Sequence, residues 1–128
     1  MTIRVLIIDD NIDNLGVIAE MLSIEGAEYT AIQHPKQVNT TIAKDAAFDV
    51  VFLDLEMPEI DGYDIFNTLK ADTRFSGIPI IAHTVHVSEI SVARDMGFDG
   101  FIGKPLDADA FPSQLKQILA GKSVWITP

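Results

Sequence analysis

Short apolar segments alternate along this chain with segments whose apolar residues recur at helical spacing. The apolar segments are rich in β-branched residues, and polar or turn-forming residues follow each of them. Such segments are typical of buried strands in a parallel sheet. The predicted strands cover residues 3–8, 29–32, 50–53, 78–82 and 101–102. This alternation predicts an α/β domain built around one parallel sheet.

The segments between and after the strands predict five helices. Asp10 or Asn11 can cap the first helix, and Gly26 follows its predicted end. In the fifth helix Pro112 is tolerated only in the first turn, so we expect this helix to begin near Asp109. The predicted helices cover residues 12–22, 35–42, 63–69, 88–96 and 109–121.

Right-handed crossover connections restrict the order of the strands in such a sheet. We predict a flavodoxin-like (βα)5 fold, a three-layer sandwich whose parallel five-stranded sheet has the order 2-1-3-4-5. Residues 1–121 are expected to form the domain, and residues 122–128 a short tail. The apolar residues Val124, Trp125 and Ile126 of this tail are expected to fold back on the domain rather than dock on a partner or a second copy.

Acidic residues outnumber basic residues by 19 to 9, which gives the 128-residue chain a formal net charge of -10. Such a charge opposes direct binding to nucleic acid and to anionic lipid surfaces. The chain has no cysteine, so disulfides and thiolate metal sites are excluded. A strand that begins by Ile3 leaves no room for a signal peptide, and no apolar run approaches the ~20 residues of a membrane-spanning helix. We therefore expect a cytoplasmic location, and the oligomeric state stays open.

Polar side chains follow four of the predicted strands. Asp9 and Asp10 follow the first strand, Asp54 the third, Thr84 the fourth and Lys104 the fifth. The carboxyl ends of parallel strands meet at one edge of a sheet, and open α/β sheets bind their ligands at that edge. The predicted strand order therefore gathers these five side chains in one site.

Three carboxylates at one edge of the sheet indicate a bound cation. Two ionised carboxylates ~5 Å apart repel each other by ~3 kcal/mol at an effective dielectric constant of about 20. The all-oxygen ligands favour Mg²⁺, which accepts one or two carboxylates and often completes its shell with water and phosphate oxygens. We therefore predict a Mg²⁺ site with room for a phosphoryl group.

Asp54 is also predicted to be a nucleophile, because carboxylates are known to form aspartyl-phosphate intermediates. Phosphoryl transfer spreads negative charge over equatorial oxygens, for which Lys104 offers a positive charge and Thr84 a hydroxyl donor. Each residue taken alone has an ordinary explanation, since aspartates cap helices and Lys-Pro often follows a strand. Their joint placement favours the site.

With these residues in place, the chain resembles the receiver domains of two-component response regulators over nearly its whole length. The resemblance rests on a set of motifs, each at the end of a predicted strand. They are Asp9-Asp10, Asp54 followed by Met57-Pro58 and Asp61-Gly62, Thr84, and Lys104-Pro105. In this family Pro58 and Gly62 would be structural residues.

The resemblance implies a phosphoacceptor signalling domain that promotes only its own phosphorylation and dephosphorylation, and not an enzyme. A sensor histidine kinase would phosphorylate Asp54 in a Mg²⁺-dependent reaction. Asp10, Asp54 and the backbone carbonyl of Glu56 would bind the metal directly, and Asp9 mainly through water. Because the chain ends just after the fifth helix, we expect a stand-alone domain that signals through a histidine phosphotransfer protein or another protein target.

The resemblance also implies a switch. Thr84 and Lys104 would hold the phosphoryl oxygens, and the Lys104-Pro105 peptide bond would be cis. Thr84 would move toward the phosphoryl group and Phe101 would turn inward, which remodels the surface of the fourth helix, fifth strand and fifth helix. As a residue by itself, Phe101 is equally well explained as part of the core.

Two residues depart from the family pattern. Val85 follows Thr84 where receivers usually have a smaller residue, and we expect it to narrow access to Asp54. His83 precedes Thr84 where an apolar residue is more usual. The three histidines, His34, His83 and His86, show no metal-ligand spacing and are interpreted as surface or loop residues, with His86 near the phosphorylation site.

Three alternatives stay open on the sequence. A Mg²⁺-dependent phosphatase of the haloacid-dehalogenase type also uses a strand-end aspartate, but its motif has a second aspartate where Glu56 stands. A flavodoxin-like flavin binder needs a hydroxyl- and glycine-rich loop after the first strand, which this chain lacks. A degenerate receiver that works without phosphorylation is disfavoured because the acidic residues, threonine and lysine are all present.

Overall fold

A parallel sheet forms the centre of the protein in the computed structural model, which describes residues 2–34, 37, 47–57 and 61–127. Within these residues the sheet has six strands in the order β2-β1-β3-β4-β5-β6. The strands are β1 (Arg4–Ile8), β2 (Glu28–Ile32), β3 (Val50–Leu53), β4 (Ile80–Thr84), β5 (Gly100–Gly103) and β6 (Val124–Ile126). The flavodoxin-like fold and the order 2-1-3-4-5 are therefore confirmed, with a further strand beside β5.

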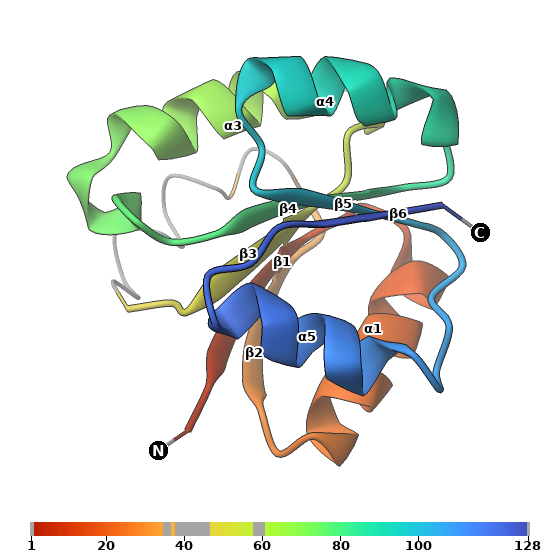
Figure 1. Cartoon of the computed structure of the whole chain (residues 1–128). Coiled ribbons are helices and arrows are strands. Elements are labelled where there is room, and N and C mark those ends of the chain that lie inside the picture. Colours follow the sequence, from red (N-terminus) through yellow and green to blue (C-terminus); the bar gives the residue numbers. More distant parts are fainter. Residues whose placement is uncertain (1, 35–36, 38–46, 58–60, 128) are drawn as a thin grey trace.

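Helices cover both faces of this sheet. The described helices are α1 (Ile12–Ile24), α3 (Gly62–Ala71), α4 (Ile90–Met96) and α5 (Phe111–Leu119), with short 3-10 turns η2 (Thr73–Phe75) and η3 (Val87–Glu89). Helices α3 and α4 lie on one face and α1 and α5 on the other (Figure 1). The helix predicted over residues 35–42 falls almost wholly outside the described residues.

Local sequence explains where the described helices begin. The side chain of Asn11 accepts hydrogen bonds from the backbone N–H groups of Asp13 and Asn14, so it caps α1. Pro112 is the second residue of α5, where its missing N–H removes no helical hydrogen bond. Helix α4 begins at Ile90 rather than at residue 88, because η3 occupies the preceding residues.

Two corrections concern the strands. β4 covers residues 80–84 instead of 78–82, because Pro79 has no N–H for the ladder, although its carbonyl oxygen accepts from Val51 N at 2.9 Å. The stretch predicted as a tail contains β6, which pairs in parallel with residues 100–102 of β5. The expected fold-back of the tail thus takes the form of a sixth strand.

The core has two halves, one on each face of the sheet. Successive residues of each strand point to opposite faces, so every central strand contributes to both halves. The half under α3 and α4 includes Leu6, Val51, Leu53, Phe66 and Phe101. The half under α1 and α5 includes Val5, Ile7, Phe52, Phe111 and Leu115. Burial on both faces explains why the strands read as continuous apolar runs.

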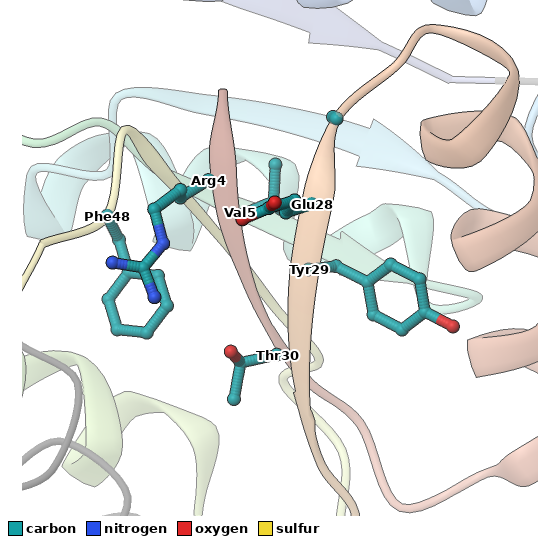
Figure 2. A pocket seen from close by; sticks show the side chains of 7 residues that line it. Arg4, Val5, Glu28, Tyr29, Thr30 and Phe48 are labelled. Atoms are coloured by element: carbon teal, nitrogen blue, oxygen red, sulfur yellow. The ribbon is translucent and has the colours of Figure 1, made fainter. Parts of the chain in front are cut away.

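A cavity of about 320 Å³ lies beside β1 and β2 (Figure 2). Its lining includes Arg4, Glu28, Tyr29, Thr30 and Phe48, and the guanidinium carbon of Arg4 lies 5.8 Å from the Phe48 ring centroid. Arg4 and Glu28 begin their strands, so this cavity is at the opposite edge of the sheet from the strand ends that carry the predicted site. Among the described residues, no helix is sufficiently long and apolar to span a bilayer.

Candidate functional site

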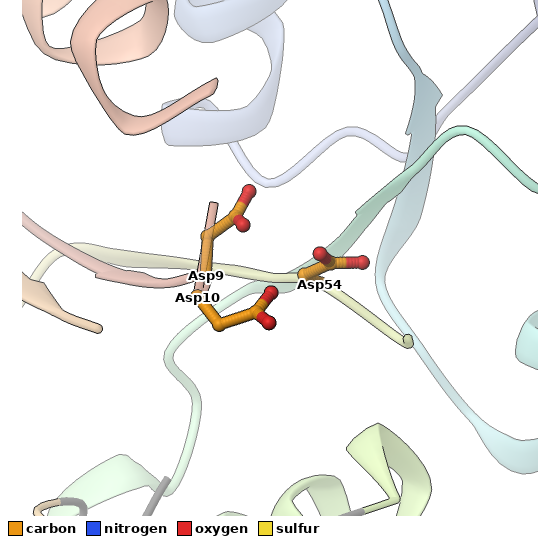
Figure 3. A group of neighbouring side chains, drawn as sticks. All are labelled: Asp9, Asp10 and Asp54. Carbon is orange, nitrogen blue, oxygen red and sulfur yellow. The ribbon is translucent and has the colours of Figure 1, made fainter. Parts of the chain in front are cut away.

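The three predicted carboxylates meet where β1 and β3 end. Ile8 pairs with Leu53, so the residues that follow these two strands lie side by side. One carboxylate oxygen from each of Asp9, Asp10 and Asp54 lies within 4.8 Å of the others. Figure 3 shows the three side chains gathered at the ends of these adjacent strands. The strand order alone therefore brings together residues that are 45 positions apart in the chain.

Lys104 supplies the positive charge of the site. Its ammonium nitrogen lies 2.7 Å from Oδ2 of Asp9 and 3.3 Å from Oδ2 of Asp54. The side chains of all three residues are buried, with at most 8% of their surface exposed. Low solvent access strengthens such pairs, because water screens their charges less.

Backbone N–H groups fix the orientation of two carboxylates. Oδ1 of Asp9 accepts a hydrogen bond from Asn11 N at 2.9 Å, and Oδ1 of Asp54 accepts one from Glu56 N at 3.0 Å. In each case the second oxygen, Oδ2, is the atom that faces Lys104. The loops after β1 and β3 therefore hold one oxygen of each acid and leave the other for the site.

Burial raises the pKa of Asp54 from 3.8 to about 6. The hydrogen bond from Glu56 N and the charge of Lys104 lower this pKa, and the nearby charge of Asp9 raises it, but loss of solvation is the largest effect. A cation bound among the carboxylates would favour the ionised form of Asp54, which is the nucleophilic form.

Thr84 reaches the same edge of the sheet at the end of β4. It is fully buried, its register partner is Gly103, and its carbonyl oxygen accepts from Lys104 N at 2.9 Å. Its hydroxyl oxygen accepts a hydrogen bond from His86 N at 3.2 Å. The end of β4 and the residue after β5 are therefore tied together next to the carboxylates.

A close contact between the side chains of Glu56 and His86 was not predicted from the sequence. Glu56 Oε2 lies 2.6 Å from His86 Nε2, and both side chains are about half exposed. Each residue stands two positions after a predicted site residue, Asp54 or Thr84, and this spacing is the signal that could have revealed the pair. The pair links the loop after β3 to the loop after β4 at the surface of the site.

Gly62 lies against the backbone that follows Asp54. A Cβ atom at Gly62 would be 2.6 Å from the Cα of Leu55 and 2.7 Å from the carbonyl oxygen of Asp54. Any side chain at this position would therefore displace the loop that carries Asp54. Pro58, the other residue predicted to be structural, lies outside the described residues.

The prediction that His83 is a surface or loop residue is wrong. His83 lies inside β4 with 4% of its surface exposed, and its Nδ1 is 2.8 Å from the carbonyl oxygen of Ile102. It faces the half of the core that contains Phe52, whose ring it meets edge-on at 6.5 Å. The strand is shifted two residues along the chain from its predicted range, which places His83 in a buried position. His34 and His86 are exposed, as predicted.

The structure also describes the other predicted residues. Phe101 is fully buried in β5 and packs in the half of the core under α3 and α4, so it already lies in the inward position that the resemblance expects only after phosphorylation. The Lys104-Pro105 peptide bond is cis. Val85 is 59% exposed in the loop after β4.

The family model of the response regulator receiver domain matches residues 5–116. The chain belongs to this family. Among curated proteins, Stress response regulator protein 1 of Candida tropicalis is 36% identical over 108 residues, which cover 81% of this chain and 40% of that protein. Hybrid signal transduction histidine kinase L of Dictyostelium discoideum is 28% identical over 91% of this chain and 7% of the kinase. This receiver chain thus spans about two fifths of the first relative.

Solved structures show the same fold. Chemotaxis protein CheY4 of Vibrio cholerae has a TM-score of 0.82 and 20% identity, and the match covers 92% of this receiver and 99% of that chain. The receiver domain of a Pseudomonas aeruginosa sensor histidine kinase, solved with magnesium coordinated in its active site cleft, has a TM-score of 0.79 and 22% identity over 94% of this chain and 99% of that chain. Receivers are signalling domains of two-component systems, so the chain is a signalling domain of this kind.

The residues present fit a magnesium ion. Asp9, Asp10 and Asp54 offer only carboxylate oxygens, which are the ligands that Mg²⁺ prefers. A single buried ammonium from Lys104 balances one of these three charges when all three are ionised. A divalent cation would balance the remaining two.

Proposed function

We propose that Asp54 of this receiver accepts a phosphoryl group from a histidine kinase in a Mg²⁺-dependent reaction. The observation that carries the proposal is the position of the Lys104 ammonium, within 3.3 Å of carboxylate oxygens of both Asp9 and Asp54 at the carboxyl ends of the strands. A carboxylate nucleophile, a cluster of acids and a fixed cation are together suited to phosphoryl transfer.

In this reaction Oδ2 of Asp54 attacks the phosphorus of a phosphohistidine. The new bond joins this oxygen to phosphorus, the N–P bond breaks, and the leaving imidazole retains the electron pair of that bond. Lys104, already next to Oδ2, would then pair with an oxygen of the transferred group, and Thr84 would donate its hydroxyl to another. Both interactions strengthen as negative charge spreads over the phosphoryl oxygens.

Asp10 and Asp54, with the backbone carbonyl of Glu56, would hold the magnesium ion directly, and Asp9 would act mainly through water. The ion would neutralise the carboxylates and the charge on the phosphoryl oxygens. The backbone N–H groups of Asn11 and Glu56 orient the carboxylates of Asp9 and Asp54 without the ion.

The phosphorylated receiver would act through protein contacts at α4, β5 and α5. The kinase as donor is supported by the Dictyostelium relative, which is named a hybrid histidine kinase. A histidine phosphotransfer protein or another protein is the proposed recipient of the signal. The predicted cytoplasmic location belongs to this proposal.

The test is intact-mass measurement after incubation with acetyl phosphate, a small phosphodonor. We expect the mass of one phosphoryl group to appear in Mg²⁺ and to be absent in EDTA. Asp54→Asn should not gain it, while Asp95→Asn, which changes an exposed acid in α4, should gain it like the parent. A label that persists in Asp54→Asn would contradict the assignment. Multiple turnover of a generic phosphoester would favour the phosphatase alternative.

A further inference from the structure

Strand β6 covers the outer edge of β5. Its three residues pair in parallel register with residues 100–102, and β6 is the outermost strand on this side of the sheet (Figure 1). The approach is close: a Cβ atom at Gly100 would lie 2.7 Å from the carbonyl oxygen of Val124 and 2.9 Å from Cδ1 of Ile81. Strand β6 is thus fitted to β5 at a position where only glycine leaves room for it.

Trp125 connects β6 to the residue predicted to be the aromatic switch and to α4. It is the register partner of Phe101, and it packs against the same half of the core. Phe101 is fully buried, and Trp125 lies on its outer side, partly exposed. The guanidinium carbon of Arg94, in α4, lies 4.7 Å from the Trp125 ring centroid. A change in the position of Phe101 or α4 must therefore change the surroundings of Trp125.

The other end of β5 is tied to the phosphoacceptor site. Gly103 pairs with Thr84, Lys104 N donates to the Thr84 carbonyl oxygen at 2.9 Å, and the Lys104 side chain contacts Asp54. Phosphorylation of Asp54 would replace that contact, because the Lys104 ammonium would then face a phosphoryl oxygen. Strand β5 is therefore connected to the phosphoacceptor site at its carboxyl end and to β6 along its outer edge.

We propose that β6 is a regulatory strand. Its pairing with β5 is coupled to phosphorylation of Asp54, such that phosphorylation weakens this pairing. The inference rests on the proposed function. Close packing fits β6 to one arrangement of β5 and α4, so a rearrangement of either element on phosphorylation would pack against β6 less well. Strand β6 has only three residues, and one of its edges is unpaired within the described sheet, so little energy is needed to shift it. By linkage, weaker pairing of β6 with β5 must favour the phosphorylated form of Asp54 by the same equilibrium factor.

Through this coupling β6 becomes part of the signalling surface formed by α4, β5 and α5. A protein that reads the α4, β5 and α5 side would meet β6 and Trp125 before β5, because β6 covers the edge of β5. Loosening β6 would expose the edge of β5 and the side of Phe101. The partner would thus detect the position of β6 rather than the phosphoryl group itself.

The first test follows β6 during phosphorylation of the whole chain. Trp125 is the only tryptophan, so the tryptophan emission reports on the surroundings of this one residue of β6. With acetyl phosphate and Mg²⁺ we expect a change in its emission. Amide hydrogen exchange in residues 122–127 should become about fivefold faster or more, the lower limit of typical allosteric coupling. Residues 28–32, in the strand at the opposite edge, should not change.

Intact-mass measurement on the same samples separates the possible failures. A phosphoryl mass gain with unchanged emission and unchanged exchange in β6 would overturn this inference and leave the proposed function standing. Slower exchange in β6 would overturn the proposed direction. Absence of the mass gain would overturn the proposed function, and this inference with it.

The second test measures the reciprocal effect. Gly100→Ala would unseat β6, and Arg94→Gln would remove only the contact of α4 with Trp125. At a fixed concentration of acetyl phosphate both should reach a higher phosphorylated fraction than the parent, and Val92→Ala, an exposed control in α4, should match the parent. Equal phosphorylated fractions in the parent, the control and Arg94→Gln would contradict the coupling, even if Gly100→Ala does not fold.

Discussion

The ammonium nitrogen of Lys104 lies 2.7 Å from Oδ2 of Asp9, although 95 positions separate the two residues in the chain. Both side chains are almost completely buried, at 5% and 3% exposure. A buried ion pair is costly to break, because the remaining partner keeps an uncompensated charge. The contact between Lys104 and Asp9 therefore orders the site, and the stability of the fold also depends on this contact.

Replacement of Lys104 should make stability depend on magnesium. Lys104→Met leaves Asp9 and Asp54 without their cation, so we expect a loss of about 3 kcal/mol in the free energy of unfolding in EDTA. A divalent cation among the carboxylates should restore much of this loss. Urea unfolding with and without Mg²⁺ measures both effects. Lys122→Met, which changes an exposed lysine, should stay within about 0.5 kcal/mol of the parent, and a loss that Mg²⁺ does not reduce would contradict the prediction.

Asp54→Asn should stabilise the metal-free protein more at neutral pH than in acid. The pKa of Asp54 is raised from 3.8 to about 6, so its ionised form is disfavoured in the folded state. This cost is fully present above the folded pKa and disappears as the pH falls below 3.8. After allowance for screening by solvent, we expect a gain of about 1 to 2 kcal/mol above pH 6, measured by denaturant unfolding in EDTA. An equal effect at all pH values would contradict the raised pKa.

His83 should lower the stability of the protein in mild acid. Burial lowers its pKa from 6.5 to about 4, so the unfolded chain takes up the proton first as the pH falls. The resulting loss of stability begins near pH 6.5 and is complete near pH 4. His83→Leu removes the titrating group, so the unfolding free energy of the variant relative to the parent should rise by about 3 kcal/mol across this range. Parallel curves for the two proteins would contradict a buried neutral imidazole.

Gly62→Ala should destabilise the fold and disturb the phosphoacceptor loop. The new Cβ atom would meet backbone atoms at 2.6 and 2.7 Å, which cannot move aside as a flexible side chain can. We expect a loss of about 1 to 3 kcal/mol in the free energy of unfolding, with slower labelling of Asp54 by acetyl phosphate. Gly16→Ala is the matched control, because apart from neighbouring residues and the backbone of α1 itself no atom lies within 4 Å of its Cβ position. That control should gain about 0.5 to 1 kcal/mol, since alanine favours a helix interior over glycine.

The order of the strands could be predicted from the sequence because strands and helices alternate and right-handed crossovers restrict the topology, and the ends of the central strands are marked where an apolar run meets a polar residue. Val50 to Leu53 followed by Asp54 shows both features within five residues. Strand ends were harder to place. The predicted range of this strand ends before His83, yet a hydrogen bond with the Ile102 carbonyl oxygen satisfies the Nδ1 atom of His83 in the interior.

Strand β6 could not be recognised from its own residues. Three apolar positions, Val124 to Ile126, are equally typical of a tail that packs on the surface. What makes them a strand is the edge of β5, which offers backbone groups at a distance that Gly100 allows. The contact between Glu56 and His86 is similar, because each partner is an ordinary exposed residue until the two loops are placed side by side.

The sequence by itself determined which residues can take part in the chemistry and which strand each of them follows, because apolar periodicity and residue type are local properties of the chain. Only the tertiary structure decided the contacts of Lys104 with Asp9 and Asp54, the burial of His83, and the seating of β6 under Arg94. These depend on distances between segments that are far apart in sequence. Such distances follow from how closely the strands and helices pack in three dimensions, which no local pattern encodes.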